Sequence, residues 1–181
     1  SPTSTGLRSV RMISANDGWA VGFGGTILHW DGIDWSLVNS PITTPLGDIA
    51  VIGAGGWAVG SYGTFLRWNG TVWQTVSNPP SQPMNGIDVF STQNGWAVGD
   101  DGVIKRWQNG SWSVVNSPTT TKLNAVSVAS LTDVWTVGDN GLILHWNGSM
   151  WLGFSSPTNV NLNDIQMLST DDGWIVGDQG T

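Results

Sequence analysis

The sequence predicts an all-β repeat fold from three observations. First, the stretch Gly18-Trp19-Ala20-Val21-Gly22 returns four more times with small changes, and its tryptophans stand 38, 39, 39 and 39 residues apart. Second, the 181 residues include 25 Gly and 13 Trp but no Glu, so strand- and turn-forming residues outnumber helix formers. Third, each full copy ends in two tryptophans that flank an Asp-Gly or Asn-Gly pair. A fixed period of about forty residues is typical of propellers and solenoids.

Ser-Pro or Asn-Pro pairs divide the chain into consecutive units. These pairs are Ser1-Pro2, Ser40-Pro41, Asn78-Pro79, Ser117-Pro118 and Ser156-Pro157. We therefore expect a single domain over residues 1–181. Its repeats are 1–39, 40–77, 78–116, 117–155 and an incomplete repeat, 156–181. Because each repeat in such an array contacts only its neighbours, the core is expected to be a row of similar interfaces.

Each unit is expected to begin with a strand in which apolar residues alternate, since a period of two is typical of strands. In the first unit this strand covers about residues 7–13, with Val10 and Met12 on its buried face. The equivalent pairs are Ile49/Val51, Ile87/Val89, Val126/Val128 and Ile165/Met167. The second strand is the Trp-Ala-Val-Gly stretch. The turn after it ends in Gly25, Gly63, Gly102, Gly141 or Gly180, where a residue that tolerates positive φ is needed.

The third strand, residues 26–30 in the first unit, and the fourth, which starts at Trp35, are expected to form a hairpin. The turn residues are Asp31-Gly32, Asn69-Gly70, Asn109-Gly110 and Asn147-Gly148. Such pairs favour type I′ turns, which need positive φ at both central residues. Four short antiparallel strands in each 39-residue unit describe one blade of a β-propeller, so we expect four complete blades and half a blade. The tryptophans are expected to gather at one end of each blade.

The repeat also resembles a known group of propellers. Gly-Trp-Ala-Val-Gly, a nearby Gly, a hydrophobic strand and Asp/Asn-Gly-x-x-Trp resemble the repeats of bacterial propellers related to the photosystem II stability and assembly factor. Those repeats belong to a wider group with sialidase-type Asp-box (BNR) turns, and Asp31-Gly32-Ile33-Asp34-Trp35 is similar to that turn. The resemblance covers essentially the whole chain and implies a β-propeller. It does not select one function, because the group includes assembly factors, secreted surface proteins and enzymes.

Composition narrows the classes of partner. Six Lys plus Arg against 13 Asp give a net charge of -7 and a pI near 4.3, which disfavours binding to nucleic acid. Membrane insertion is not expected, because no apolar run approaches the roughly 20 residues of a transmembrane helix. The chain has no Cys, so it forms no disulfide. Low charge and Ser/Thr-rich loops favour an extracellular or cell-surface location.

The turns between the second and third strands vary most between units, which makes them the preferred candidate for recognition. Their candidate ligand-binding residues are Phe23, Tyr62, Asp100, Asp101, Asp139, Asn140, Asp178 and Gln179. The alternative is that short turns tolerate Asp and Asn without any binding role. We expect no cofactor and no metal, because calcium needs about 6–8 clustered oxygen ligands and no such cluster is evident.

The third strand gives a second candidate, a sugar site in each blade. It places a cation beside a tryptophan in His29/Trp30, Arg67/Trp68, Arg106/Trp107 and His145/Trp146. These pairs would suit a lectin, or the cations would merely cover tryptophan rings. A glycoside hydrolase is less favoured, because it normally needs two carboxylates or a Tyr nucleophile, and the chain has no Glu and only Tyr62. No catalytic residue is therefore expected.

The sequence thus favours a non-catalytic propeller module that binds protein or carbohydrate, or that assembles through open blade edges. The unit at 156–181 supplies only two strands, and unpaired edges invite another chain to join. A homo-oligomer, a polymer or a longer chain would each satisfy those edges.

Overall fold

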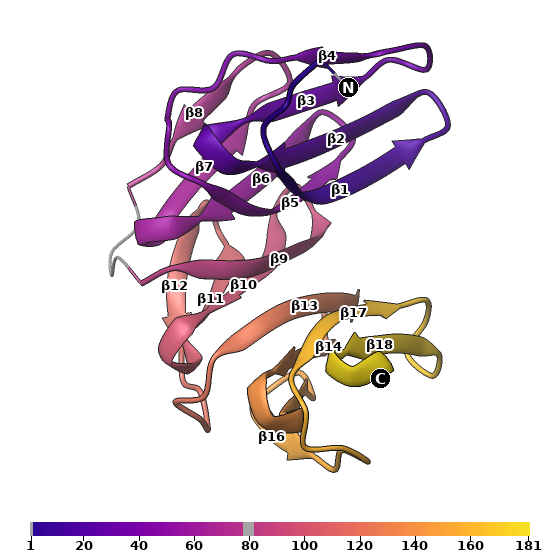
Figure 1. The fold of residues 1–181 in the computed structure, drawn as a ribbon. Coiled ribbons are helices and arrows are strands. Elements are labelled where there is room, and N and C mark those ends of the chain that lie inside the picture. The colour runs from indigo at the N-terminus through magenta and orange to yellow at the C-terminus, as the bar shows by residue number, and fades with distance from the viewer. Residues whose placement is uncertain (1, 78–81) are drawn as a thin grey trace. The chain divides into compact units, whose positions relative to one another are not determined.

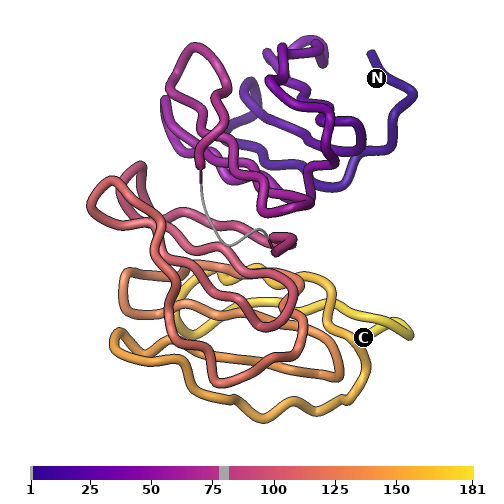
Figure 2. Tube along the Cα trace, turned by 90° about the vertical axis from the view of Figure 1, so that its left-hand side faces the viewer, coloured from indigo at the N-terminus to yellow at the C-terminus, as the bar shows by residue number. Residues whose placement is uncertain are grey.

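The computed structural model describes residues 2–77 and 82–181. The expected unit boundary at Asn78-Pro79, and Ser1 of the first boundary, lie outside the described residues. The chain divides into two compact units, Ser1–Met84 and Asn85–Thr181. Figures 1 and 2 show that consecutive strands run up and down within each sheet. Among the described residues, no helix is long and apolar enough to cross a membrane.

The first unit contains two antiparallel four-stranded sheets in which neighbours in sequence pair. Their strands are β1 (Leu7–Ser14), β2 (Asp17–Gly22), β3 (Ile27–Trp30) and β4 (Trp35–Leu37), then β5 (Leu46–Ile52), β6 (Gly55–Gly60), β7 (Thr64–Trp68) and β8 (Trp73–Thr75). The second strand of each sheet is the Trp-Ala-Val-Gly stretch, which is buried at almost every position.

The second unit contains two further four-stranded sheets and one two-stranded sheet. The strands of the first two are β9 (Met84–Ser91), β10 (Asn94–Gly99), β11 (Ile104–Gln108) and β12 (Ser111–Val115), then β13 (Leu123–Ser130), β14 (Asp133–Gly138), β15 (Ile143–Trp146) and β16 (Trp151–Phe154). The two-stranded sheet pairs β17 (Leu162–Met167) with β18 (Gly173–Gly177). The antiparallel four-stranded sheets predicted from the sequence are therefore present.

In each four-stranded sheet a short 3-10 turn joins the second and third strands. In the two-stranded sheet the equivalent turn follows the second strand. These turns are η1 (Phe23–Gly25), η2 (Ser61–Gly63), η3 (Asp100–Gly102), η4 (Asp139–Gly141) and η5 (Asp178–Gly180). The predicted need for glycine at the third turn position is confirmed, because all five glycines there have φ between 68° and 76°. At Gly141 there is a second reason, since a Cβ would overlap the carbonyl oxygen of Thr158.

The hairpins between the third and fourth strands differ from the prediction in three sheets. Only Asn109-Gly110 has positive φ at both residues, as a type I′ turn requires. In the first sheet Trp30 pairs with Trp35, which leaves a four-residue loop. There the Asp31 carboxylate accepts the backbone N–H groups of Ile33 and Asp34, both at 2.9 Å. Asn69 and Asn147 accept equivalent pairs of bonds, so side-chain acceptors replace the two-residue turn.

The core of each unit lies between its sheets and combines aliphatic side chains with tryptophans. Trp19 of β2 packs between Trp68 and Trp73 of the next sheet, with ring centroids 4.8 and 5.5 Å away. Trp96 of β10 packs in the same way against Trp146 and Trp151, at 4.9 and 5.2 Å. We call each pair of third- and fourth-strand tryptophans a tryptophan notch. The expected gathering of tryptophans is confirmed, and it occurs between neighbouring sheets.

One predicted buried pair is exposed. Val10 and Met12 of β1 are solvent-accessible, whereas the equivalent residues of β5, Ile49 and Val51, are buried. The difference has a simple cause, because β5–β8 is covered by β1–β4 within the first unit. The matching face of β1–β4 has no covering sheet among the described residues of that unit.

Candidate functional site

Each of the turns η1–η5 lies at one end of its own sheet, and we call that end the turn end. Their middle residues are Gly24, Tyr62, Asp101, Asn140 and Gln179. The four non-glycine residues have φ of 57° or 58°, a left-handed conformation that costs an L-residue roughly 1 kcal/mol. All four side chains are exposed. These predicted site residues are therefore held in an unusual backbone conformation and presented to solvent.

The first residue of the turn has a different role in the second unit. Asn85 donates from Nδ2 to Oδ1 of Asp100 and to the carbonyl oxygen of Leu123, both at 2.9 Å. Asn124 makes the same pair of bonds to Asp139 and to the carbonyl oxygen of Leu162, again at 2.9 Å. We call this arrangement the Asn–Asp clamp. It ties a turn to the first strand of the next sheet.

The clamp is partly repeated at the last turn. Asn163 donates to Oδ1 of Asp178 at 2.8 Å, and Asn161 donates to its other carboxylate oxygen at 3.1 Å. The carboxylates of Asp100, Asp139 and Asp178, all predicted as ligand-binding, are thus engaged by Asn side chains. Because the clamp occupies the first turn residue, the exposed middle residue is the one left to contact a partner.

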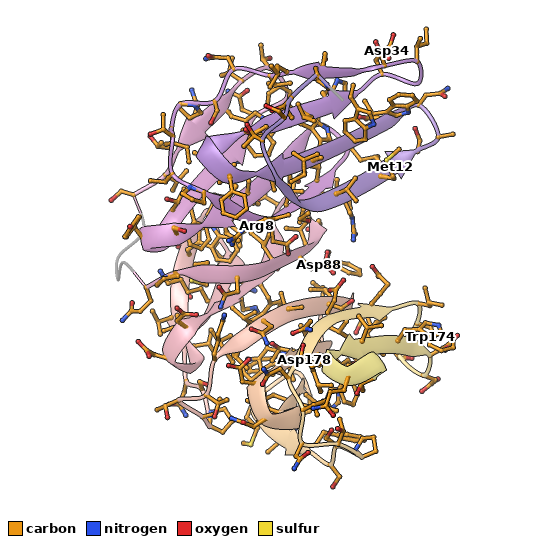
Figure 3. The ribbon with its side chains drawn as sticks, viewed as in Figure 1. Arg8, Met12, Asp34, Asp88, Trp174 and Asp178 are labelled. Atoms are coloured by element: carbon orange, nitrogen blue, oxygen red, sulfur yellow. The ribbon has the colours of Figure 1, made fainter. Side chains whose placement is uncertain are left out.

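The first unit uses other residues at the same positions. Arg8, labelled in Figure 3, occupies the position that the clamp Asn has in the second unit. Its guanidinium lies 4.3 Å from the centroid of the Phe23 ring. Tyr62 in η2 is 76% exposed. The turn end is therefore aromatic and basic in the first unit and polar and acidic in the second.

Sequence reasoning missed the clamp asparagines and Arg8. A signal was present, because units whose turn begins with Asp carry Asn as the second residue of the first strand. Units whose turn begins with Phe23 or Ser61 carry Arg8 or Gly47 there. Comparing columns between repeats would have revealed this pairing.

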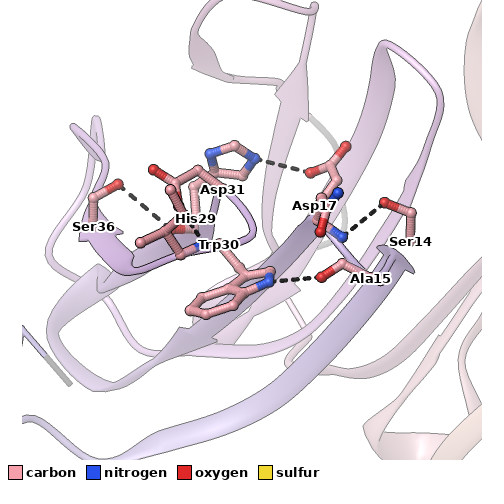
Figure 4. Close-up of polar contacts among 9 residues, drawn as sticks. Ser14, Ala15, Asp17, His29, Trp30, Asp31 and Ser36 are labelled. Atoms are coloured by element: carbon pink, nitrogen blue, oxygen red, sulfur yellow. Dashed lines mark hydrogen bonds and ion pairs between the residues drawn. The ribbon is translucent and has the colours of Figure 1, made fainter.

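The predicted cation and tryptophan residues meet at the opposite end of the sheets. In the first unit His29 lies 2.9 Å from Oδ1 of Asp17 (Figure 4), and its ring is 4.4 Å from Trp19. These three residues and Trp68 of the next sheet line a pocket of about 310 Å³. Val38, Gly53, Ala54 and Gly70 complete its wall.

The pocket does not use the tryptophan that follows His29 in sequence. Successive strand residues point to opposite faces, so Trp30 lies on the other side of β3. Its indole donates to the carbonyl oxygen of Ala15 at 3.0 Å (Figure 4) and packs on Trp35. The structure thus joins the cation of one sheet to the tryptophan of the next.

The other predicted cations follow the same rule of stacking on a second-strand tryptophan. Arg67 lies 5.7 Å from Trp57, and His145 stacks on Trp135 at 4.1 Å while contacting Asp133 at 3.1 Å. Arg106 lies 5.1 Å from Trp96 and 5.6 Å from Trp146 of the next sheet. Trp107 instead donates to the carbonyl oxygen of Thr92. Within each unit, therefore, the sequence-adjacent pairs are not the ones that meet.

Two ionisable groups have shifted pKa values. The backbone N–H groups of Asp34 and Ile33 hold the pKa of the Asp31 carboxyl below its ordinary value. Burial lowers the pKa of the Lys105 ammonium, which occupies a β11 position held by leucine in the other four-stranded sheets. No group of three or more His, Cys, Asp or Glu residues in the described ranges could hold a metal ion.

Comparison with known proteins gives the fold. No protein-family model and no curated protein sequence matches the chain. Solved structures do match. "YCF48 bound to D1 peptide" has a TM-score of 0.76 at 16% identity over 98% of this chain, and YCF48 from Cyanidioschyzon merolae 0.73 at 18% over 99%. The WD40 β-propeller domain of Doa1 has a TM-score of 0.78 at 14% identity over 97%.

These similarities show that the chain has a β-propeller fold, with repeated four-stranded sheets as blades. The chain spans 62%, 66% and 63% of the length of these three structures. At identities this low the likeness concerns the fold alone.

Proposed function

We propose that the chain is a non-catalytic β-propeller module that binds a partner protein through its turn end. The observation that carries this proposal is that, within each clamped turn, one residue anchors the turn and the next one faces solvent. The Asn–Asp clamp fixes the turn, while the middle residue stays exposed in a conformation that the clamp helps to hold. Rigid presentation of exposed side chains lowers the entropy lost on binding, which is how preorganised sites gain affinity.

The chemistry of the turn end suggests the kind of partner. Tyr62 offers an exposed aromatic ring in the first unit, and Asp101 adds an exposed carboxylate in the second. With a net charge of -7, the chain attracts basic segments more readily than acidic ones. YCF48 was solved with a D1 peptide bound, which supports a peptide as the ligand. We therefore infer an apolar protein segment at the turn end of the first unit and a basic one at the turn end of the second, each unit being considered by itself.

We also propose a repeat unit, a family relationship and a location for the chain. We infer that each four-stranded sheet is one 39-residue repeat, marked by its Trp-Ala-Val-Gly stretch. We also infer a relationship to propellers with BNR-type turns, because Asp31 organises its loop by accepting two backbone N–H groups. An extracellular or cell-surface location remains part of the proposal on grounds of composition.

The test is selection of peptides from a displayed random library against the chain, followed by fluorescence anisotropy with the enriched peptides. Tyr62→Gly and Asn140→Gly remove exposed turn-end side chains. Ile33→Ser is the matched control, because Ile33 is 79% exposed at the hairpin end of the first sheet. We expect the turn-end variants to weaken binding and the control to leave it unchanged. Loss of binding in the control alone, or no enriched peptide, would contradict the proposal.

The pocket beside His29 favours a second candidate, carbohydrate binding. Sugars stack on indole rings and hydrogen-bond to carboxylates and imidazoles, and Trp68, Asp17 and His29 supply these groups around about 310 Å³. A glycan array identifies ligands, and tryptophan fluorescence measures their affinity. Trp68→Ala should remove binding, whereas Trp30→Ala, on the opposite face of β3, should not. The reverse pattern would contradict a site in this pocket.

A further inference from the structure

We propose that the pocket beside His29 binds the guanidinium group of an arginine side chain from a partner protein. The pocket lies within the first unit, and its polar and aromatic lining consists of Asp17, Trp19, His29 and Trp68. It lies at the end of the sheets opposite the turn end, so this inference does not depend on peptide binding there. It names a cation, instead of a sugar, as the ligand of this pocket.

The second unit has a guanidinium at the equivalent place. Arg106 of β11 pairs across strands with Trp96 of β10. Its guanidinium carbon lies 5.1 Å from the centroid of the Trp96 ring and 5.6 Å from that of Trp146 on the next sheet. A guanidinium within about 6 Å of a ring centroid is attracted to the face of that ring. Two tryptophans from neighbouring sheets therefore hold this cation.

The first unit has the same pair of rings with a shorter side chain beside them. His29 of β3 takes the place of the arginine and pairs with Trp19 of β2. The ring centroids of Trp19 and Trp68 are 4.8 Å apart, compared with 4.9 Å for the two rings beside Arg106. The imidazole of His29 lies 4.4 Å from Trp19, and a pocket of about 310 Å³ remains beside Trp68. The space that a guanidinium fills in the second unit is thus open in the first.

Small residues keep the pocket open. Its wall includes Gly70 and the two residues of the turn between β5 and β6, Gly53 and Ala54. In the second unit the turn between β13 and β14 has Leu131 and Thr132 in their place. The first unit thus combines a shorter strand residue with a smaller turn, and the pocket has room for a side chain from another protein.

Asp17 supplies the negative charge that a cationic ligand requires. Nε2 of His29 lies 2.9 Å from Oδ1 of Asp17 (Figure 4). The other oxygen, Oδ2, accepts no hydrogen bond among the described residues, and the Asp17 side chain is 41% exposed. A guanidinium suits this acceptor because its N–H groups form strong, charge-assisted bonds to carboxylates. In the second unit Asn94 stands at the position of Asp17, and there the chain itself provides the cation.

The geometry favours arginine over lysine. A guanidinium is planar, so its face can stack on Trp68 while its edge donates to Asp17, whereas an ammonium is a compact and strongly hydrated charge. The chain also uses arginine, and not lysine, at this strand position in two other sheets, where Arg67 and Arg106 lie on tryptophans. We therefore expect an arginine peptide to bind more tightly than a lysine peptide.

Titration of the full chain with short peptides tests the proposal, with the indole N–H signals of Trp19 and Trp68 followed by NMR. The probes are a capped glycine peptide with one central arginine and the same peptide with lysine or citrulline at that place. Citrulline has the shape of arginine without its charge. We expect the arginine peptide to shift both indole signals saturably, and the citrulline peptide to bind at least about tenfold more weakly.

His29→Arg should fill the pocket from within, as Arg106 does in the second unit, and so abolish binding of the arginine peptide. The variant is expected to fold, because Arg67 and Arg106 occupy the same strand position. Ile33→Arg is the matched control, since it adds the same charge at a 79% exposed residue of the same sheet that does not line the pocket. It should leave binding unchanged, whereas Asp17→Asn should weaken it at least about tenfold. Circular dichroism verifies that all three variants fold.

Three results would overturn the proposal. The first is the absence of a saturable shift with the arginine peptide, and the second is equal binding of the arginine and citrulline peptides. The third is undiminished binding to His29→Arg. Glycans that bind the protein but not His29→Arg, with no binding of the arginine peptide, would assign the pocket to carbohydrate. Tyr62→Gly tests the turn end and should leave the arginine titration unchanged, so the two proposals fail separately.

Discussion

Replacing Asn124 by Ala removes one complete Asn–Asp clamp. The change deletes the bond to the Asp139 carboxylate and the bond to the Leu162 carbonyl oxygen, both 2.9 Å long. A hydrogen bond to a charged group contributes about 1.5–3 kcal/mol and a neutral one about 0.5–1.5 kcal/mol. Because the site is only partly buried, we expect the free energy of unfolding to fall by about 2–4 kcal/mol.

Asn163→Ala is the matched comparison. Asn163 makes only the bond to Asp178 among the described hydrogen bonds, in an exposed setting where Asn161 also holds that carboxylate. We expect its loss to cost less than about 1 kcal/mol.

Urea denaturation followed by tryptophan fluorescence measures both variants. With a denaturant slope of about 2 kcal/mol/M, Asn124→Ala should lower the unfolding midpoint by about 1–2 M. Hydrogen exchange should increase for the backbone of β13 and β17 in the same variant, because the clamp joins them. Equal midpoints for the two variants would refute the assignment of the clamp as a link between sheets.

Three further changes follow from the structure. Tyr62→Gly should leave the free energy of unfolding unchanged or raise it by up to about 1 kcal/mol, because glycine adopts the φ of 57° without strain. Thermal unfolding measures this, and a clear loss of stability would contradict the assignment of strain to Tyr62. Gly141→Ala should lower the free energy of unfolding by more than about 2 kcal/mol, because it combines a positive φ with overlap of Thr158, whereas Gly153→Ala, with open space around it, serves as control. Asp31→Asn keeps the loop acceptor, as Asn69 and Asn147 do, but removes the ionisable group. The pKa of Asp31 is lowered in the folded state, so its ionised form stabilises the native protein above the ordinary value of 3.8. This advantage over the Asn variant should disappear as the pH falls through the lowered pKa. Urea midpoints of both proteins at several pH values would show the loss, and a difference that stays constant with pH would contradict it.

The blade pattern could be predicted from sequence because its signals are local. Alternation along the first strand, the repeated tryptophan of the second strand and glycine at the end of each turn are all set by backbone geometry. The hairpins were predicted less well, because Asp31, Asn69 and Asn147 use side-chain oxygens to accept backbone N–H groups. That choice between two turn types depends on loop length, which the strand pairing of Trp30 with Trp35 decides.

The site residues were harder to predict because they combine different sheets. His29 was paired with Trp30 on sequence adjacency, but alternation along β3 sends them to opposite faces, and the partner comes from β7. Burial of Val10 and Met12 was predicted from their similarity to Ile49 and Val51. Periodicity identifies which face is apolar, whereas only packing decides whether another sheet covers it.

In each turn the middle residue is left-handed, and anchoring of the turn and display of a side chain fall to different residues. The anchor residue and the display residue are adjacent, and in the second unit it is the carboxylate of the anchor that Asn side chains hold. Tyr62, Asp101, Asn140 and Gln179 share almost the same backbone angles although their side chains have little in common. A mutation at this position can therefore alter the displayed chemistry without disturbing the neighbouring sheet. Such a scaffold can acquire new binding specificities one turn at a time.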